Sequence, residues 1–445
     1  MADGAHPAAD PGEGTVHVIG AGLAGLSAAL TAAEAGRRVA VWEGAGHAGG
    51  RCRSFHDAVL DRRIDNGSHL VLTGNDAVQR YLARTGAPQG LMAAPDAIFP
   101  MVDLAATGAD RRFAVHLNAG PIPWWPLVAG RRVPGTRPWD YLGGWRLALA
   151  GPQTTVAEAI RDRGPLWRAL WEPLTLGILN TTPERGQARL LWRALERTFL
   201  RGAGPTRPMF APEGLGEALV TPALDRMAAL GVTVTYNRPL QALERAAGRI
   251  EALVFSDRRI VLGPGDAVIL ALPPGRLRRL IPEVDPPVDE GAILNAHFRV
   301  RPETLPTDTP PLTGMIGSLG QWVFVRGDVI SVTVSAADSL GILATPREEI
   351  AATLWREVAA VLCLKETAPE AARIIVEKRA TFDQSPGGVA QRLAARTDLA
   401  NLILAGDATD TGLPATIEGA VLSGEIAAGH VAAMAAGTVE RAGRE

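Results

Sequence analysis

Hydrophobic residues near the start of the chain are grouped into a strand, a helix and a second strand. Residues 15–19 (TVHVI) form a short apolar run that is typical of a buried strand. Residues 23–36 (LAGLSAALTAAEAG) are rich in small and apolar side chains and predict a helix, and 37–43 (RRVAVWE) predict another strand. Because these elements in succession form one βαβ unit, we expect the chain to begin with an α/β fold.

Three later stretches also have regular patterns. Residues 347–364 are predicted to be an amphipathic helix. Residues 290–335 contain runs that alternate between apolar and polar positions, which predicts strands of a sheet that floors a substrate cavity. Residues 155–200 predict helices, with an apolar face that includes Leu166, Trp167, Leu170, Trp171 and Leu174.

The turn after the first strand has the glycine spacing of a dinucleotide-binding loop. Gly20 permits a tight turn, Gly22 lets the backbone approach a pyrophosphate, and Gly25 lets the helix pack closely on the strand. Free N–H groups at the start of the helix, including those of Leu23 and Ala24, would face the phosphates. The loop therefore predicts a dinucleotide cofactor.

Residues after the second strand indicate which dinucleotide is bound. Glu43 is placed to accept hydrogen bonds from the adenosine ribose, where it would repel the 2′-phosphate of NADP. Gly44 begins a glycine-rich stretch that leads to Gly50 and Arg51, and an arginine there can lie on the pyrophosphate. Since NAD-binding units seldom need such an arginine, FAD is the expected cofactor.

A second segment that would contact FAD lies near the C-terminus. Residues 401–424 predict a strand that ends at Gly406 and Asp407, followed by a loop and a new helix. The Asp407 carboxylate can bond the ribityl hydroxyls. The start of the helix, at Thr416 and Ile417, can face the flavin pyrimidine and favour the negative charge of reduced flavin.

These two segments resemble the flavin amine oxidase and phytoene desaturase superfamily. The resemblance covers most of the chain and is weak through 80–200 and 280–395, where the superfamily has its variable substrate domain. It implies that residues 232–240 contact adenine through the backbone near Leu240, and that 267–274 return the chain toward the flavin. The implied fold class is α/β, with a glutathione-reductase-like FAD-binding Rossmann domain and a discontinuous α+β substrate domain.

The expected domains alternate along the chain, because both ends contribute to the FAD-binding domain. We expect a disordered tail over residues 1–13, an FAD-binding domain over 14–75, 205–275 and 398–440, and a substrate domain over 76–204 and 276–397.

Two motifs resemble one branch of the superfamily, the hydroxysqualene dehydroxylases of hopanoid synthesis. They are residues 64–69 (IDNGSH), where Gly67 and Ser68 would pass close to the isoalloxazine ring, and 171–183 (WEPLTLGILNTTP). The resemblance implies the reductive removal of the hydroxyl of a C30 isoprenoid alcohol to give squalene. The implied chemistry is acid-assisted loss of an allylic hydroxyl, then hydride transfer from N5 of reduced flavin to the carbocation.

His69 is the candidate catalytic residue. It lies in the flavin-adjacent motif, and imidazole suits proton transfer near neutral pH. It would protonate the hydroxyl or position the departing water; alternatively, it only forms a structural hydrogen bond to backbone beside the cofactor. Asp65 is expected to buttress the loop, and Asn66 and Asn180 are weaker polar candidates for the cavity.

Features that the sequence lacks also limit the reaction. There is no second GxGxxG motif, so we expect an external electron donor rather than an internal NAD(P)H site. Amine oxidases of the superfamily usually have a lysine beneath flavin N5, whereas the lysines here are Lys365 and Lys378. A carotenoid-type desaturase is the main alternative, because the sequence does not set the direction of hydride flow. An amine oxidase or a flavoprotein scaffold without turnover is less favoured, and no metal site is expected.

The composition is that of an ordinary soluble globular protein, and the cysteine usage favours the cytoplasm. The chain has 445 residues, of which 47% are hydrophobic and 21% charged, and a net charge of −2. Without a basic cluster, this charge argues against a nucleic-acid partner. Cys52 and Cys363 are too few for a disulfide framework and indicate a reducing compartment. No apolar run of about 18 residues lacks a charge, so no membrane-spanning helix is expected.

Residues 121–146 nevertheless suit a membrane surface. Aromatic rings favour the interfacial region and arginines favour anionic headgroups. Since a C30 hydrocarbon is nearly insoluble in water, we expect this segment to dock peripherally on the inner face of the membrane and to open a tunnel toward the flavin. Alternatively, the tryptophans fill the core of the substrate domain. The residues concerned are Trp124, Trp125, Trp139, Tyr141 and Trp145, with Arg131, Arg132, Arg137 and Arg146.

Overall fold

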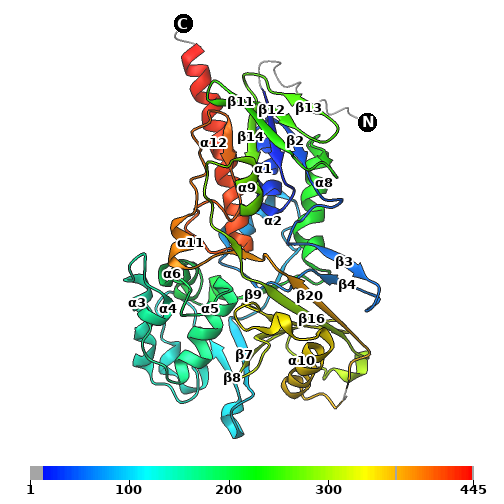
Figure 1. Cartoon of the computed structure of the whole chain (residues 1–445). Coiled ribbons are helices and arrows are strands. Elements are labelled where there is room, and N and C mark those ends of the chain that lie inside the picture. Colours follow the sequence, from blue (N-terminus) through cyan, green and yellow to red (C-terminus); the bar gives the residue numbers. More distant parts are fainter. Residues whose placement is uncertain (1–13, 366–367, 443–445) are drawn as a thin grey trace, which may run out of the picture.

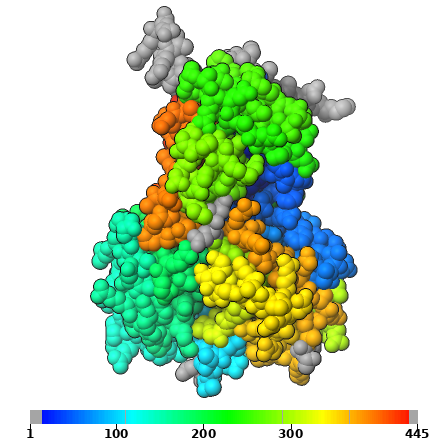
Figure 2. All heavy atoms as spheres, in the orientation of Figure 1, coloured from blue at the N-terminus to red at the C-terminus, as the bar shows by residue number. Residues whose placement is uncertain are grey.

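The computed structural model of the chain describes residues 14–365 and 368–442. Its upper part is built around a parallel sheet, and its lower part consists of a helical lobe beside a second large sheet (Figure 1). The space-filling view shows the two lower lobes against each other beneath the upper part (Figure 2). The predicted tail at 1–13 lies outside the described residues.

A five-stranded sheet with the order β10-β2-β1-β14-β22 forms the centre of the upper part, and all its neighbouring strands run parallel. A parallel sheet is normally covered on both faces, which explains the nearly unbroken apolar runs in its central strands. The strands are β1 (Thr15–Ile19), β2 (Arg38–Trp42), β10 (Val234–Thr235), β14 (Ala267–Leu270) and β22 (Leu402–Leu404).

Helices pack on one face of this sheet and a small antiparallel sheet packs on the other. The strand–helix–strand unit predicted at the start of the chain is confirmed, and so is the helix predicted to begin near Thr416. The helices are α1 (Leu23–Glu34), α8 (Thr221–Ala229) and α12 (Ile417–Ala442). The small sheet contains β11 (Ala242–Ala246), β12 (Arg249–Val254) and β13 (Arg259–Val261), with α9 (Pro274–Leu280) beside it.

The second large sheet has seven strands in the order β20-β16-β19-β18-β17-β7-β8. All of its pairings are antiparallel except that of β17 with β7. This confirms the strands predicted within 290–335. The strands are β7 (Ile98–Asp103), β8 (Arg112–His116), β16 (Ile293–Arg299), β17 (Leu312–Ile316), β18 (Trp322–Arg326), β19 (Val329–Val334) and β20 (Ala371–Glu377).

The outer face of this sheet is covered by α10 (Arg347–Leu362), which confirms the helix predicted at 347–364. The helical lobe packs against the other face. Trp167 and Trp171 are buried in that lobe, within the π-helical turn Trp167–Trp171. The remaining helices of the lobe are α3 (Trp145–Ala148), α4 (Val156–Ala159), α5 (Glu172–Leu179) and α6 (Ala188–Arg197).

Short elements connect the two parts. Residues 66–70, which include the candidate histidine, lie between β4 (Arg62–Asp65) and β5 (Val71–Leu72). These elements are β3 (Ser54–Asp57), β4 (Arg62–Asp65), β5 (Val71–Leu72), β6 (Met92–Ala93), α7 (Ala203–Thr206), β9 (Pro208–Phe210), β15 (Asp289–Glu290), β21 (Thr381–Phe382) and α11 (Pro386–Ala390).

The helix α2 (Asp76–Arg84) packs into the core beneath the parallel sheet. The carboxylate of Glu418, on α12, accepts hydrogen bonds of 3.0 Å from the backbone N–H groups of both Ala77 and Val78. The division of the chain into domains stays a prediction. We propose that α2 belongs with the FAD-binding domain, although the sequence analysis assigned it to the substrate domain.

Candidate active site

One cavity of about 890 Å³ extends from the loop after β1 to the seven-stranded sheet. Most of the residues predicted for the cofactor and for catalysis line it: Gly20, Gly22, Leu23, Ala24, Glu43, Gly50, Arg51, Gly67, Ser68, His69, Gly406, Asp407, Thr416 and Ile417.

Three predicted residues support this cavity without lining it. Gly25 lies under the loop, where an added Cβ would collide with the carbonyl oxygen of Gly20. Gly44 packs beside Pro239, and Leu240 is buried with its carbonyl oxygen 3.1 Å from a guanidinium nitrogen of Arg276.

The loop after β1 fits a dinucleotide. Gly20 has a φ of +103°, in the region that favours glycine, and this turns the chain from β1 into α1. No atom lies within 4 Å of a Cβ added to Gly22, so the space above the start of α1 is open. The Glu43 carboxylate is fixed beside it by the backbone N–H groups of Ala21 at 2.7 Å and Ala45 at 2.8 Å. An extended diphosphate therefore has room here, with N–H groups as donors to its phosphates and the Glu43 carboxylate as an acceptor for the attached ribose.

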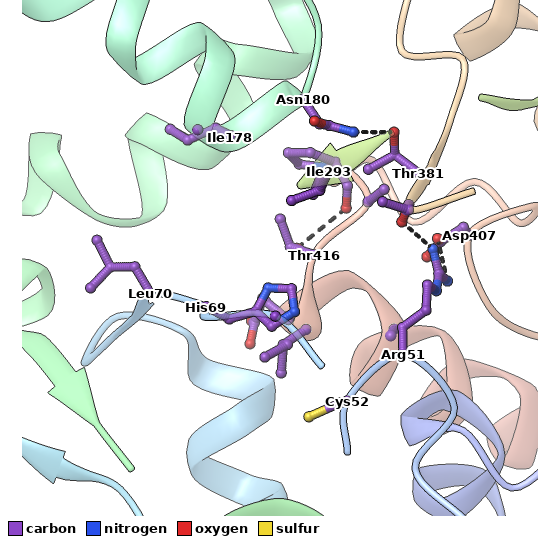
Figure 3. Close-up of a pocket in the computed structure, with 18 of the residues that line it drawn as sticks. Arg51, Cys52, His69, Leu70, Ile178, Asn180, Ile293, Thr381, Asp407 and Thr416 are labelled. Carbon is purple, nitrogen blue, oxygen red and sulfur yellow. Dashed lines mark hydrogen bonds and ion pairs between the residues drawn. The ribbon is translucent and has the colours of Figure 1, made fainter. Parts of the chain in front are cut away.

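Arg51 and Asp407 meet on one side of the cavity (Figure 3). Their charged groups lie 2.6 Å apart, and Arg51 also donates a hydrogen bond of 2.5 Å to the carbonyl of Ala380. The sequence analysis assigned Arg51 to the pyrophosphate and Asp407 to the ribityl hydroxyls. These roles stay predictions, and the structure adds that the two side chains bind each other.

Asp65 holds the loop that carries the candidate histidine. Its carboxylate accepts hydrogen bonds from the Ser54 hydroxyl at 2.5 Å, the Leu215 backbone N–H at 2.9 Å and the Arg326 guanidinium at 2.7 Å. A carboxylate with three donors is firmly oriented. The expected structural role of Asp65 is therefore confirmed.

His69 lies between the apolar and the charged ends of the site. Leu70 and Ile178 are on one side of its ring, and Arg51 with Asp407 is on the other (Figure 3). Burial is the main cause that lowers the pKa of His69; the negative charge of Asp65 opposes this shift, the positive charge of Arg51 adds to it, and the net shift is downward. The ring is therefore neutral at pH 7. It forms no hydrogen bond with the described part of the chain, so the backbone contact required by the structural alternative is not seen there.

The two weaker polar candidates, Asn66 and Asn180, also line the cavity. The Asn180 amide is used by the fold: it donates to the carbonyl of Gly291 at 2.9 Å and to the Thr381 hydroxyl at 3.2 Å, and it accepts from the Ala336 backbone N–H at 2.7 Å. Asn180 therefore joins segments that are distant in the sequence, and few of its hydrogen-bonding positions remain for a substrate.

The sequence analysis did not identify the polar residues of the cavity floor. Asn295 on β16, Thr333 on β19 and Ser335 just after it line the cavity, and all three are buried. A signal was present, because buried polar residues within otherwise apolar strands are uncommon. The strand pattern alone, however, did not show which face of the sheet would border the cavity.

The chain matches the model of the family described as flavin containing amine oxidoreductase over residues 23–432. It is 42% identical to the hydroxysqualene dehydroxylase of Sinorhizobium fredii over 413 residues, which is 93% of this chain and 97% of the relative. It is also 42% identical to the hydroxysqualene dehydroxylase of Rhodopseudomonas palustris over 94% of this chain and 98% of the relative.

A solved structure supports the fold. The cyclohexylamine oxidase of Brevibacterium oxydans superposes with a TM-score of 0.70, covering 94% of this chain and 99% of that one at 13% identity. This likeness shows the FAD-binding fold alone. Together with the family model and the close relatives, it shows that this chain is an FAD-dependent oxidoreductase of the flavin containing amine oxidoreductase family, within the hydroxysqualene dehydroxylase branch.

Proposed function

We propose that the chain catalyses the reductive removal of the hydroxyl of hydroxysqualene to give squalene, as a step toward hopanoids. The observation that carries this proposal is the continuity of the cavity, which joins the dinucleotide loop to an apolar floor. That floor includes Phe99, Met101, Val115, Trp322 and Phe324. Such a lining suits a long hydrocarbon with one polar group near the flavin.

In the proposed reaction, the allylic C–O bond breaks, the hydroxyl leaves as water with one added proton, and a hydride takes its place on carbon. When bound in its doubly protonated reduced form, FAD would supply both the hydride and the proton that leaves in the water, and an external donor would have to restore the reduced cofactor. His69 is neutral, so its proposed task is to hydrogen-bond and orient the departing hydroxyl. The apolar walls exclude bulk water, which would otherwise capture the carbocation.

The decisive experiment is an anaerobic single turnover. FAD-loaded protein, reduced chemically, should convert hydroxysqualene to squalene in about one equivalent and return the flavin to its oxidised form. Oxidised protein serves as the control and should give no squalene. If the oxidised protein instead forms a more unsaturated polyene from squalene or a similar lipid, the carotenoid-type desaturase is the better description.

We also propose that the protein works at the inner face of the cytoplasmic membrane and takes its substrate from the bilayer. Among the described residues, no helix is long and apolar enough to cross a membrane. Of the fifteen exposed large hydrophobic residues of the described chain, however, eight fall within 122–149. We call this set the docking patch: Ile122, Trp124, Leu127, Val128, Trp139, Leu142, Trp145 and Leu149.

One member of the docking patch, Trp145, begins α3, which lies at the outer side of the helical lobe (Figure 1). Arginines accompany its tryptophans: the Arg131 guanidinium is 5.1 Å from the centre of the Trp124 ring, and that of Arg137 is 5.6 Å from Trp139. Trp125 differs from its neighbours, because it is only 8% exposed and packs edge-on against Tyr141. Trp125 therefore fills the core of the lobe, as the alternative to membrane docking expected. The exposed tryptophans instead support docking on anionic lipid.

A further inference from the structure

The floor of the cavity changes from apolar to polar across the seven-stranded sheet. Asn295 on β16 pairs with Thr333 on β19, and Thr333 pairs with Trp322 on β18, so the three side chains share one face. On the next strands that face carries apolar residues, including Met101. Ile293 lies two residues before Asn295 on the same strand, and Figure 3 shows it in the cavity, so this end of β16 borders the cavity. Asn295 contacts the backbone N–H of Ser68, and the polar positions are therefore gathered beside the loop that contains His69.

The orientation of the Asn295 amide follows from its partners. The backbone N–H of Ser68 lies 3.3 Å from Oδ1, and the Thr333 hydroxyl donates to the same oxygen at 3.0 Å. A backbone N–H can only donate, so the atom that faces Ser68 must be the amide oxygen. The NH₂ group of Asn295 is consequently the end that remains available as a donor.

This NH₂ group has no acceptor among the described residues, although the Asn295 side chain is only 1% exposed. Its nitrogen would lie 2.9 Å from a Cβ added to Gly67, so any larger residue at position 67 would press against the amide. The group is not among the fully enclosed polar atoms of the described chain that lack a partner, which indicates that it keeps contact with the cavity that Asn295 lines. A molecule bound in the cavity can therefore supply the acceptor that this donor lacks.

We propose that the Asn295 NH₂ group binds the hydroxyl oxygen of the isoprenoid alcohol and holds it beside His69. The inference rests on the function proposed above and deepens it. The hydrocarbon then lies over Trp322 and Phe324, where the floor is apolar. The product has no oxygen and leaves the donor without an acceptor. Asn295 thereby distinguishes substrate from product and favours the release of squalene.

The test measures binding without turnover. Oxidised, FAD-loaded protein is titrated with hydroxysqualene and with squalene in the same detergent micelles, and the flavin absorbance change gives both affinities. Wild type is expected to prefer hydroxysqualene. Asn295→Ala should weaken hydroxysqualene binding about 3- to 10-fold, as expected for the loss of one hydrogen bond, and should leave squalene binding unchanged.

Ser331→Ala is the matched control. Ser331 lies on the same face of β19 but outside the cavity lining, and its hydroxyl bonds Nδ1 of His297 at 2.8 Å. It should keep the preference for the alcohol. Asn295→Leu, which fills more of the same space, provides a second variant if Asn295→Ala does not fold; it should lose the preference as well.

Three results would overturn the assignment: a wild type without preference, a variant that loses both ligands equally, or a variant whose flavin spectrum is already altered without ligand. The last would mean that the amide serves the flavin. Failure of the proposed function is recognised separately, as wild-type protein that prefers hydroxysqualene but forms no squalene from it when reduced.

Discussion

The proposed role of His69 can be tested through its protonation state. Burial lowers its pKa, with Asp65 opposing the shift and Arg51 adding to it, so the neutral ring predominates at pH 7 and above. If the neutral ring orients the hydroxyl, kcat/KM for hydroxysqualene should be level from pH 7 to 8 and should fall as the pH drops through the His69 pKa. His69→Ala should slow conversion by roughly 10- to 100-fold, as expected for the loss of an orienting hydrogen bond, while FAD is retained.

His69→Gln is the control for this pH dependence, because glutamine keeps a donor and does not titrate. The acidic fall in rate should disappear in this variant. A wild-type rate that rises on acidification would mean instead that the protonated ring is the working form and acts as the acid. A normal rate for His69→Ala would remove the residue from the reaction.

At the scale of elements, the contact between α1 and α12 fixes the cofactor end of the cavity. Gly424 of α12 lies so close to α1 that an added Cβ would collide with the carbonyl oxygen of Ala24. Because Ala24 belongs to the first turn of α1, which lines the cavity, a displacement of the helix moves the proposed phosphate site. Gly424→Ala should destabilise the protein by about 1–3 kcal/mol and weaken FAD binding.

Gly429 provides a matched control on the same helix. No atom lies within 4 Å of a Cβ added there, so Gly429→Ala should keep FAD and gain about 0.5–1 kcal/mol from the better helix propensity of alanine. Thermal unfolding with and without FAD, together with the bound flavin content, compares the two variants. Equal stability and equal flavin content would show that the close approach of α1 and α12 does not matter.

For the whole molecule, the position of the docking patch predicts how the protein meets lipid. Wild type should float with anionic vesicles, and Trp139→Ser/Leu149→Ser should float less, because these side chains are 61% and 86% exposed. Added salt should weaken flotation by screening the arginines. Val59→Ser/Val261→Ser removes exposed apolar residues outside the patch and should float like wild type. Equal flotation of all three proteins would contradict docking through this patch.

The sequence determined the parts of the molecule that depend on local pattern. The glycine spacing after β1, the acid at the end of β2 and the strand that leads to Asp407 are short-range signals. They are set by which residues permit a tight turn or alternate in burial. From them followed the α/β class, FAD, the family and most of the residues that line the cofactor end of the cavity.

Only the tertiary structure decided how distant segments combine. The NH₂ group of Asn295, and not its oxygen, remains available as a donor because Thr333 on a neighbouring strand and the backbone of Ser68 both bind the oxygen. No single stretch of sequence reveals this arrangement. Likewise, Trp125 is buried and Trp139 exposed although they share one aromatic segment. The same applies to α2, which packs into the core beneath the parallel sheet and is bound there by the carboxylate of Glu418. Partners that are far apart in the chain are fixed by packing, and local periodicity contains no information about them.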